Sequence, residues 1–391
     1  MARGSDHDFD WTRLVWPGFF AAEAALAFAR SMMAGFRPPP LPRPEPVWAS
    51  PNEVALELPA ARLRRFDRPG ATKAATPILV CAPFALHDAR IADLAEGHSL
   101  MARLGGADRP LYLVEWLSAR EDQLFRGIDD YLADLVVMVD EIGGRCDFVG
   151  LCQGGWLGLL FAARFPARVG KLVIAAAPID TEAGDTRFSA LARATPIETF
   201  QELVRLGGGL ARGEEAQRFW ELGAPSDAQI HDLLQSDLPL DSPAFADRLA
   251  MFRAWSGAPL DLPGAYYLET VQKLYKRNEL ARGEFVALGK RIDLRAVRAP
   301  LYLIAAENDD IAAPEQTFAC AWLVGTPSAA VRTKVVPGGH LDLFLGRRAL
   351  DSLWSDVVDW LAAPAPRQRP PPTSGAPSPT GAPPRRGQSA R

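Results

Sequence analysis

The run VGLCQGGWLG at residues 149–158 contains the best candidate nucleophile in this sequence, the thiol of Cys152. It stands in a Gly-x-Cys-x-Gly pattern, after an apolar run and before a segment with helical periodicity. A sharp turn from strand to helix with small flanking residues exposes the side chain at its apex, and the helix N-terminus favours a thiolate there. The pattern therefore predicts a reactive cysteine, and the alternative is a small buried residue in a glycine-rich turn.

Two later segments supply the partners that a nucleophilic thiol needs. Asp309 lies in AAENDDIAAP and His340 in VVPGGHLDLF, each just after a predicted strand. An acid and then a histidine follow the nucleophile in this order in sheets that carry such a turn. We predict that His340 takes the thiol proton and that Asp309 orients the imidazole. Asp310 is the rival acid, but Asp309 is preferred because Ile311, two residues on, returns to the core.

Backbone amides are the expected stabilisers of a tetrahedral oxyanion. One is the amide of Gln153, and the other comes from the loop after ILVCAPF, near Phe84 and Ala85. No Cys or His cluster has zinc spacing, so neither a metal nor another cofactor is expected. The remaining cysteines are expected in the core: Cys81, Cys146 and Cys320.

The elements that must position these residues alternate along the chain. Short apolar runs bounded by turn residues fit strands buried on both faces of a parallel sheet, and helical patterns separate them. This alternation predicts an α/β fold, a mostly parallel central sheet wound by right-handed crossovers. An antiparallel pair in EVALELPAARLRRF opens it, and the later strands are expected in 77–83, 110–116, 146–152, 171–178, 299–309 and 332–339.

Four segments divide the chain. The core is predicted in 50–180 and 299–363, and the interruption of the strand rhythm at 181–298 predicts a helical cap over the carboxyl edge of the sheet, where ligands bind. Residues 1–49 contain a helical stretch and a Pro-rich linker. Residues 364–391 are rich in Pro and Arg and lack large apolar side chains, which predicts disorder.

Composition excludes some classes of protein. A formal net charge of −4 over 391 residues gives no bulk electrostatic case for nucleic-acid binding. No uninterrupted apolar run is long enough for a transmembrane helix, and the polar, acidic start does not resemble a signal peptide, so a cytoplasmic location is expected. The stretch at 16–36 is read as an amphipathic helix docked on the core, with a helix lying on a lipid or polymer surface as the alternative.

Several runs together resemble the polyhydroxyalkanoate synthases, which are α/β-hydrolase-fold enzymes, and especially the short catalytic subunits of the two-component type. The resemblance extends from Ser50 to Leu361. It is carried by SLMARLGGADRPLYLVEW with GIDDYLADL, by VGLCQGG, by LYKRNELARGEFVALGKRIDLRAVRAPLYLIAAENDDIAAP, and by GGHLDLFLG. Residue by residue, it implies the same nucleophile, acid and base: Cys152, Asp309 and His340.

The resemblance also implies an activity. A synthase of this kind is an acyltransferase that polymerises 3-hydroxyacyl-CoA into a polyester chain and releases CoA, with no cofactor. The alternative is a hydrolase of the same fold, an intracellular polyhydroxyalkanoate depolymerase or a thioesterase, which Gln153 and Trp156 keep open. The implied partners are a second synthase subunit or granule proteins, the implied assembly is a homo-oligomer, and the implied place is the cytoplasm, at the surface of polyhydroxyalkanoate granules.

Overall fold

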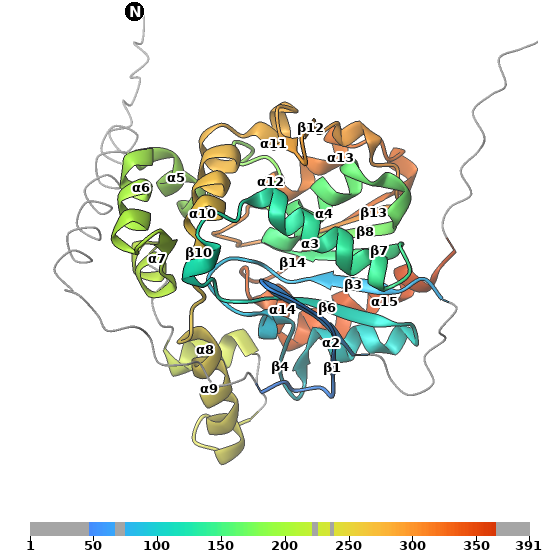
Figure 1. Ribbon diagram of the computed structural model, residues 1–391. Helices are drawn as coiled ribbons and strands as arrows, with labels where there is room; N and C mark the ends of the chain where they lie inside the picture. The colour runs from blue at the N-terminus through green and yellow to red at the C-terminus, as the bar shows by residue number, and fades with distance from the viewer. Residues whose placement is uncertain (1–46, 67–74, 221–225, 235–237, 365–391) are drawn as a thin grey trace, which may run out of the picture.

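The computed structural model describes residues 47–66, 75–220, 226–234 and 238–364 (Figure 1). The helix predicted within 16–36 and the tail predicted beyond Pro364 lie outside these ranges, as does most of the Pro-rich linker. None of the helices in the described ranges is both long and apolar enough to span a bilayer.

An eight-stranded sheet forms the centre of the molecule, in the order β1-β2-β6-β3-β7-β8-β13-β14. The six strands from β6 to β14 run parallel to one another, and β1 and β2 form an antiparallel pair at one edge. The predicted mostly parallel sheet is therefore confirmed. The strands are β1 Glu53–Leu58, β2 Ala61–Arg65, β3 Ile78–Cys81, β6 Leu111–Trp116, β7 Cys146–Leu151, β8 Val169–Ala175, β13 Leu301–Ala306 and β14 Val331–Val336.

The inner strands are apolar on both faces because each face is covered by helices. In β3, Leu79 and Cys81 point into one buried cluster, whereas Ile78 and Val80 point into the other. Helices α3 (Ile128–Glu141) and α4 (Gln153–Arg164) cover the first face. Helices α2 (Leu100–Leu104), α14 (Asp342–Leu345) and α15 (Trp354–Ala362) cover the second.

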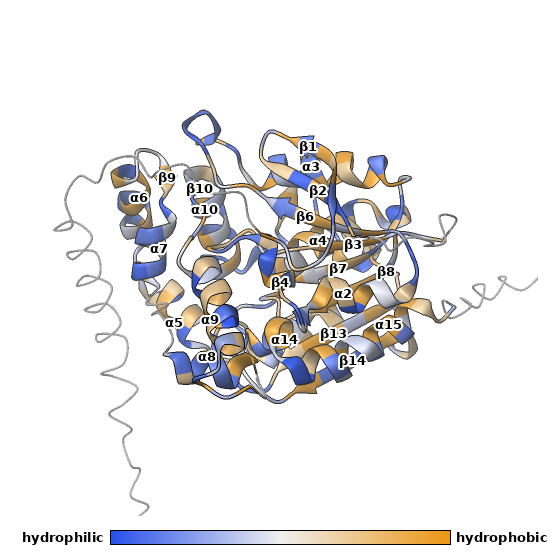
Figure 2. Ribbon diagram, turned by 90° about the horizontal axis from the view of Figure 1, so that it is seen from below, coloured by the Kyte–Doolittle hydropathy of each residue, from blue (hydrophilic) through white to orange (hydrophobic). Residues whose placement is uncertain are grey.

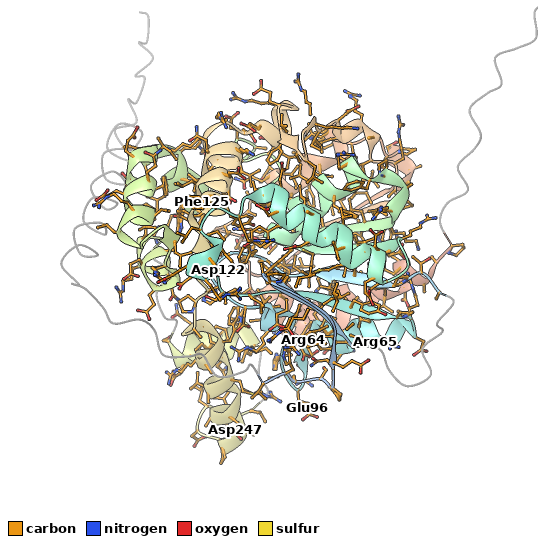
Figure 3. All side chains as sticks on the ribbon, viewed as in Figure 1. Arg64, Arg65, Glu96, Asp122, Phe125 and Asp247 are labelled. Carbon is orange, nitrogen blue, oxygen red and sulfur yellow. The ribbon has the colours of Figure 1, made fainter. Side chains whose placement is uncertain are left out.

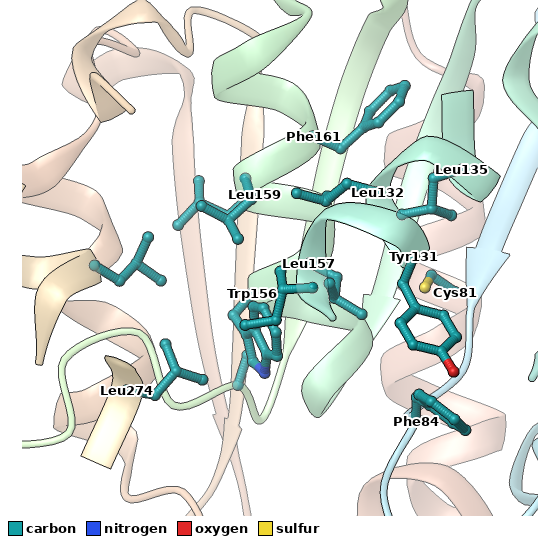
Figure 4. Packing of buried hydrophobic residues seen from close by; sticks show 14 of the residues in the cluster. Cys81, Phe84, Tyr131, Leu132, Leu135, Trp156, Leu157, Leu159, Phe161 and Leu274 are labelled. Carbon is teal, nitrogen blue, oxygen red and sulfur yellow. The ribbon is translucent and has the colours of Figure 1, made fainter. Parts of the chain in front are cut away.

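The packing on the first face brings large side chains together behind the sheet's carboxyl edge. Figure 4 shows Tyr131 of α3 beside Cys81 and Phe84, and Trp156 on α4 close by. The rings of Tyr131 and Phe84 have centroids 4.7 Å apart, a separation at which aromatic pairs attract one another. The predicted core positions of Cys81, Cys146 and Cys320 are confirmed, since all three are buried.

The long connection between β8 and β13 is mostly helical. Figure 1 shows α5, α6, α7 and α10 beside one end of the sheet, with α8 and α9 extending below them. The bounds are α5 Arg187–Ala194, α6 Ile197–Leu206, α7 Gly213–Phe219, α8 Asp227–Leu234, α9 Pro243–Ser256, α10 Gly264–Thr270, a π-helical turn Val271–Lys276, and α11 Glu279–Arg282. The small strand pairs β9 (Leu210–Ala211) with β10 (Leu262–Pro263), and β11 (Val286–Ala287) with β12 (Lys290–Arg291), were not predicted.

Hydrogen bonds hold this helical segment against the ends of the central strands. The amide of Leu260 donates to Leu86 O (2.6 Å) after β3, and Ala119 N after β6 donates to Asp261 O (2.9 Å). Thr181, after β8, donates its hydroxyl to Leu274 O (2.7 Å). The segment therefore meets the carboxyl edge of the sheet, where α/β folds place their ligands. The division into core (50–180 and 299–363) and cap (181–298) stays a prediction.

Polar side chains cover the outside and also close some ends of the elements. Figure 2 shows hydrophilic residues on outer helices such as α7 and on the β1–β2 edge of the sheet. Glu96 lies at the lower edge of the molecule in Figure 3, and Asp122 and Phe125 are both exposed, Phe125 to 90%, in the segment before α3. Lys171, buried in β8, donates to the carbonyls of Trp360 (2.7 Å), Leu361 (2.9 Å) and Ala363 and so caps α15.

Candidate active site

Cys152 forms the whole connection between β7 and α4. The strand ends at Leu151 and the helix begins at Gln153, so the chain reverses direction at this single residue. Its backbone adopts φ 49° and ψ −115°, a conformation that costs a non-glycine residue about 1–3 kcal/mol and is concentrated at functional sites. Its amide donates to Ala175 O (2.8 Å), which fixes the turn to β8.

Glycines make this turn possible because the backbone segments approach too closely for a side chain. A Cβ on Gly150 would lie 2.5 Å from Gly154 O, and one on Gly154 would lie 2.0 Å from Cys81 O. The N-terminal turn of α4 therefore rests directly on the end of β3. The predicted strand–turn–helix around Cys152 is the geometry found, and it presents the thiol at the helix N-terminus, where the helix dipole favours a negative charge.

The structure brings His340 and Asp309 together after β13 and β14. His340 Nδ1 lies 2.8 Å from Asp309 Oδ2, and the carboxylate is fully buried. The other carboxylate oxygen accepts from the amides of Ile311 (2.9 Å) and Ala312 (2.8 Å). With both oxygens held, the aspartate keeps one orientation and fixes that of the imidazole.

Cys152 lies close enough to this pair for its charge to act on His340. Because Nδ1 faces Asp309, the Nε2 nitrogen is left for the thiol. Burial by itself lowers the pKa of His340, but the charge of Asp309, the negative charge on Cys152 and hydrogen bonds to both raise that pKa well above its ordinary value. A thiol near an imidazole that a carboxylate orients is the arrangement that an activated cysteine requires.

The rival acid occupies a different environment. Asp310 is exposed, and its backbone carbonyl, not its carboxylate, accepts a weak bond from Phe188 N (3.5 Å). Ile311 and Ala312 donate to the side chain of Asp309, which closes the loop around that residue. The geometry thus pairs His340 with Asp309, and its assignment as the catalytic acid is a proposal developed below.

The three predicted oxyanion residues lie near the same turn. Gln153 is the first residue of α4, and its side-chain Oε1 accepts from the hydroxyl of Tyr266 (3.1 Å). Phe84 is fully buried, with its ring centroid 4.9 Å from that of Tyr266, and Ala85 is half-buried on the same loop. Their role as amide donors to an oxyanion stays a prediction.

The loop that follows β3 is held from below by the end of α9. His87 Nε2 lies 3.2 Å from Ser256 O, and its ring packs against that of Trp255 at 4.7 Å. Trp255 Nε1 donates to Asp88 O (3.1 Å). These contacts fix the segment that carries Phe84 and Ala85, although sequence patterns gave no sign of them.

A further aromatic residue near the thiol was missed by the sequence patterns. Tyr275 is buried in the π-helical turn, and burial first, then the charges of Cys152 and Asp309, raise its pKa. Within the described residues, no group of His, Cys, Asp and Glu side chains has the geometry of a metal site.

The chain is similar in sequence to known proteins. A family profile described as PHB de-polymerase C-terminus matches residues 231–364. The chain is 24% identical over 336 residues to the poly(3-hydroxyalkanoate) polymerase subunit PhaC of Haloferax mediterranei, covering 81% of this chain and 64% of that protein. It is 25% identical over 322 residues to the protein of the same name from Allochromatium vinosum, covering 80% and 88%.

Among solved structures, the monoacylglycerol lipase of Paleococcus ferrophilus superposes with a TM-score of 0.50 at 14% sequence identity, over 77% of this chain and 98% of the lipase. At this identity the match bears on the fold alone. The protein thus has the α/β-hydrolase fold and is related in sequence, over about 80% of its length, to the poly(3-hydroxyalkanoate) polymerases.

Proposed function

We propose that this protein is an acyltransferase that polymerises 3-hydroxyacyl-CoA and releases CoA, with Cys152 as nucleophile, His340 as base and Asp309 as the acid that orients it. The observation that carries the proposal is a cysteine at a strained strand–helix turn, near a hydrogen-bonded histidine–aspartate pair, in a chain similar to poly(3-hydroxyalkanoate) polymerases. Each of these parts has a defined task in the reaction.

In the first step, the Cys152 sulfur attacks the thioester carbonyl of the substrate. The carbon–sulfur bond to CoA breaks, and the departing CoA thiolate takes the proton held by His340. The acyl group then remains on Cys152 as a thioester. The amides of Gln153 and of the loop at Phe84 and Ala85 stabilise the intermediate oxyanion in this proposal.

In the second step, a hydroxyl group attacks the acyl-Cys152 carbonyl and gives its proton to the now neutral His340. An ester bond forms and the bond to sulfur breaks, which regenerates the thiolate and the imidazolium. Transfer between two thiols is nearly thermoneutral, so a cysteine holds the acyl group without trapping it as a stable oxyester. This explains why a thiol, and not a hydroxyl, suits the turn at residue 152.

A hydrolase is the second candidate, because the matching family profile carries the description of a polyester depolymerase. In that reaction water replaces the hydroxyl in the second step. The helical segment 181–298 favours the transferase, since a cover over the carboxyl edge of the sheet excludes water from the acyl-Cys152 thioester.

The test is the fate of the acyl group. Purified protein is incubated with 3-hydroxybutyryl-CoA, with Cys152→Ala as the matched control, and CoA, free 3-hydroxybutyrate and chloroform-soluble polyester are quantified. We expect CoA release to be matched by polyester and to be abolished in the variant, with the melting temperature unchanged. Equimolar free 3-hydroxybutyrate would replace the synthase by the hydrolase, and CoA release that persists in Cys152→Ala would remove the nucleophile assignment.

The cellular setting follows from the same proposal. A polyester product separates from water, so the enzyme works in the cytoplasm at the surface of polyhydroxyalkanoate granules, as a homo-oligomer together with a second synthase subunit or granule proteins. Adding such a subunit to the assay is expected to shorten any lag before polymer appears.

A further inference from the structure

A hollow with a volume of about 460 Å³ lies between three segments that are separate in the sequence. They are α11 with the glycine that ends it (280–283), the chain from β12 into the turn before β13 (291–295), and α13 (Cys320–Leu323). Figure 1 shows α11, β12 and α13 near one another in the upper part of the molecule. Small-molecule sites have volumes of about 300–1,000 Å³, so the hollow is large enough for one.

The side chain of Trp322 lines the hollow and remains open to solvent. Trp322 is 75% exposed, whereas Cys320 on the same short helix is fully buried. A single exposed apolar side chain needs no explanation on its own. This one, however, lines a hollow together with charged side chains, and tryptophan is among the residues that contribute most at binding surfaces.

Three arginines line the same hollow: Arg282, Arg291 and Arg295. Asp293 is the only acidic residue among the lining residues, and it accepts a hydrogen bond from the amide of Arg295 (2.9 Å). The lining therefore carries a formal charge of +2 in a chain whose formal net charge is −4. A concave surface of one charge sign raises the local concentration of ligands of the opposite sign, so this hollow favours an anion.

Hydrogen bonds fix two of the guanidinium groups and leave most of their donors unused. Arg291 Nε donates to Gly283 O (2.6 Å), and Arg282 Nη2 donates to Glu182 Oε1 (2.8 Å). No ion pair joins the guanidinium of Arg295 to another residue in the described ranges. Each guanidinium has five N–H donors, and its planar shape matches two oxygens of a phosphate at once.

The segments that carry Trp322 and Arg295 are in direct contact with each other. A Cβ on Gly325, two residues after α13, would lie 2.1 Å from Arg295 O. Arg298 Nη1 also donates to Gly325 O (2.9 Å). The indole and the arginine turn are therefore held in one arrangement, and a ligand that fits between them does not have to order these segments first.

We propose that this hollow binds a nucleoside phosphate, whose base stacks on the indole of Trp322 and whose phosphate groups are held by Arg282, Arg291 and Arg295. An aromatic face and several guanidinium groups match the two parts of this ligand, a planar base and a phosphate chain. The nucleotide end of CoA and a free nucleotide share this chemistry. The proposal adds a second binding site to the protein and does not depend on acyl transfer at Cys152.

An acidic peptide is the competing partner, because arginine and tryptophan also serve at protein interfaces. A stable protein interface buries about 800 Å² on each partner, spread over about 20–30 residues. The hollow is lined by 11 residues and encloses a volume suited to one small molecule, which favours the nucleotide.

Binding is measured by isothermal titration calorimetry with ADP, adenosine, CoA and a glutamate-rich peptide. The wild type is compared with Trp322→Ala and Arg295→Ala. Phe125→Ala and Arg205→Ala are the matched controls, because both side chains are largely exposed and neither lines the hollow. Cys152→Ala separates this binding from the proposed acyl transfer.

We expect the Kd for ADP to rise about tenfold in Trp322→Ala and about tenfold in Arg295→Ala, since each variant loses one main contact. The Kd should stay within about twofold in Phe125→Ala, Arg205→Ala and Cys152→Ala, the range of a side chain without a direct contact. Adenosine, which has no phosphate, should bind at least about tenfold more weakly than ADP.

The two sources of the ligand are distinguished in the same titrations. If CoA binds at least about tenfold more tightly than ADP and loses this advantage in Trp322→Ala, the occupant is the nucleotide end of CoA. Equal Kd values for ADP and CoA, both raised in Trp322→Ala, identify a free nucleotide as the occupant.

The inference fails if neither ADP nor CoA binds, if Trp322→Ala and Arg295→Ala bind ADP as tightly as the wild type, or if only the peptide binds. A failure of the proposed function gives a different result, a wild type that releases no CoA from 3-hydroxybutyryl-CoA. Because ADP carries no acyl group, its binding tests the hollow whichever way that assay ends.

Discussion

Asp309 and Asp310 are adjacent in the chain, but only one of them is buried against His340. Replacing Asp309 by Asn keeps the shape of the side chain and removes the charge that orients and stabilises the imidazolium. We expect Asp309→Asn to lower kcat for CoA release by about 10³–10⁴-fold, as in related triads. Asp310→Asn is the matched control and should leave the rate within a small factor, and the opposite ranking would move the acid to Asp310.

The protonation of His340 provides a second test of its pairing with Asp309. Burial lowers its pKa, but Asp309 and Cys152 outweigh burial and raise it, so the wild-type ring keeps its proton as the pH passes the ordinary value of about 6.5. In Asp309→Asn the main raising charge is gone, so the pKa should fall and the ring should lose its proton at a lower pH.

This shift is measured by following the imidazole C2 proton by NMR across a pH titration. The signal of His98 serves as an internal reference, because burial lowers its pKa, its Nδ1 lies 2.9 Å from Leu345 O, and Asp309 is not among the charges that act on it. An unchanged titration of His340 in Asp309→Asn would mean that the carboxylate does not set the charge of the ring.

Among individual residues, the sequence predicted those site residues that stand in a recognisable local pattern. Cys152 stands between glycines at a strand–helix junction, and Asp309 and His340 each follow a strand, so local pattern and order were sufficient to select them. Tyr275 could not be selected, because its position depends on a change of helix type that leaves no trace in the hydrophobic pattern. The bond from Tyr266 to Gln153 joins residues far apart in the sequence, which no spacing rule reveals.

Among the elements, α4 and β3 make the closest contact near the site. A Cβ on Gly154 would lie 2.0 Å from Cys81 O, and neither backbone can move without displacing the turn at Cys152. Gly154→Ala should therefore lower the free energy of unfolding by about 3 kcal/mol and reduce CoA release as the turn shifts. Gly106→Ala is the control, since its Cβ would meet nothing within 4 Å. A wild-type melting temperature in Gly154→Ala would contradict this close contact.

Helix α15 depends on a lysine from the sheet for its C-terminal cap. The last carbonyls of a helix have no partner within it, and Lys171 bonds three carbonyls at this end. Lys171→Met should lower the free energy of unfolding by about 2 kcal/mol, measured by urea denaturation, while the activity of the folded protein is retained. Lys290→Met, at an exposed position on β12, should change stability little, and equal effects of the two substitutions would refute the capping role.

Sequence periodicity predicted the strands better than the helical segment. The buried runs at 77–83, 110–116 and 146–152 became β3, β6 and β7, because an apolar run of this length between turn residues has few other stable solutions. The stretch from Pro263 to Leu280 reads as one helix but contains α10, the π turn and the start of α11. Contacts with Thr181 and Gln153 impose this division, and they arise only in the folded molecule.

Across the whole molecule, one sheet separates two apolar clusters, and the site lies at the sheet edge where the helical segment meets it. The sequence predicted this architecture because strands buried on both faces require helices on both faces. It did not predict how α9 would hold the loop after β3, since that contact joins His87 to Ser256. Long-range contacts of this kind depend on the completed fold.

The pairing of β8 with β13 also determines the order in which the parts of the site form during folding. The chain leaves β8 at Ala175 and enters β13 only at Leu301, so closing this loop costs more entropy than closing the shorter connections between the other parallel strands. The turn at Cys152 needs only local contacts and its neighbouring strands, and can form early. Asp309 and His340 come next to this turn only after β13 and β14 have joined the sheet. Until these slowest strands pair, a newly made chain therefore has the turn at Cys152 but lacks the histidine and aspartate beside the thiol.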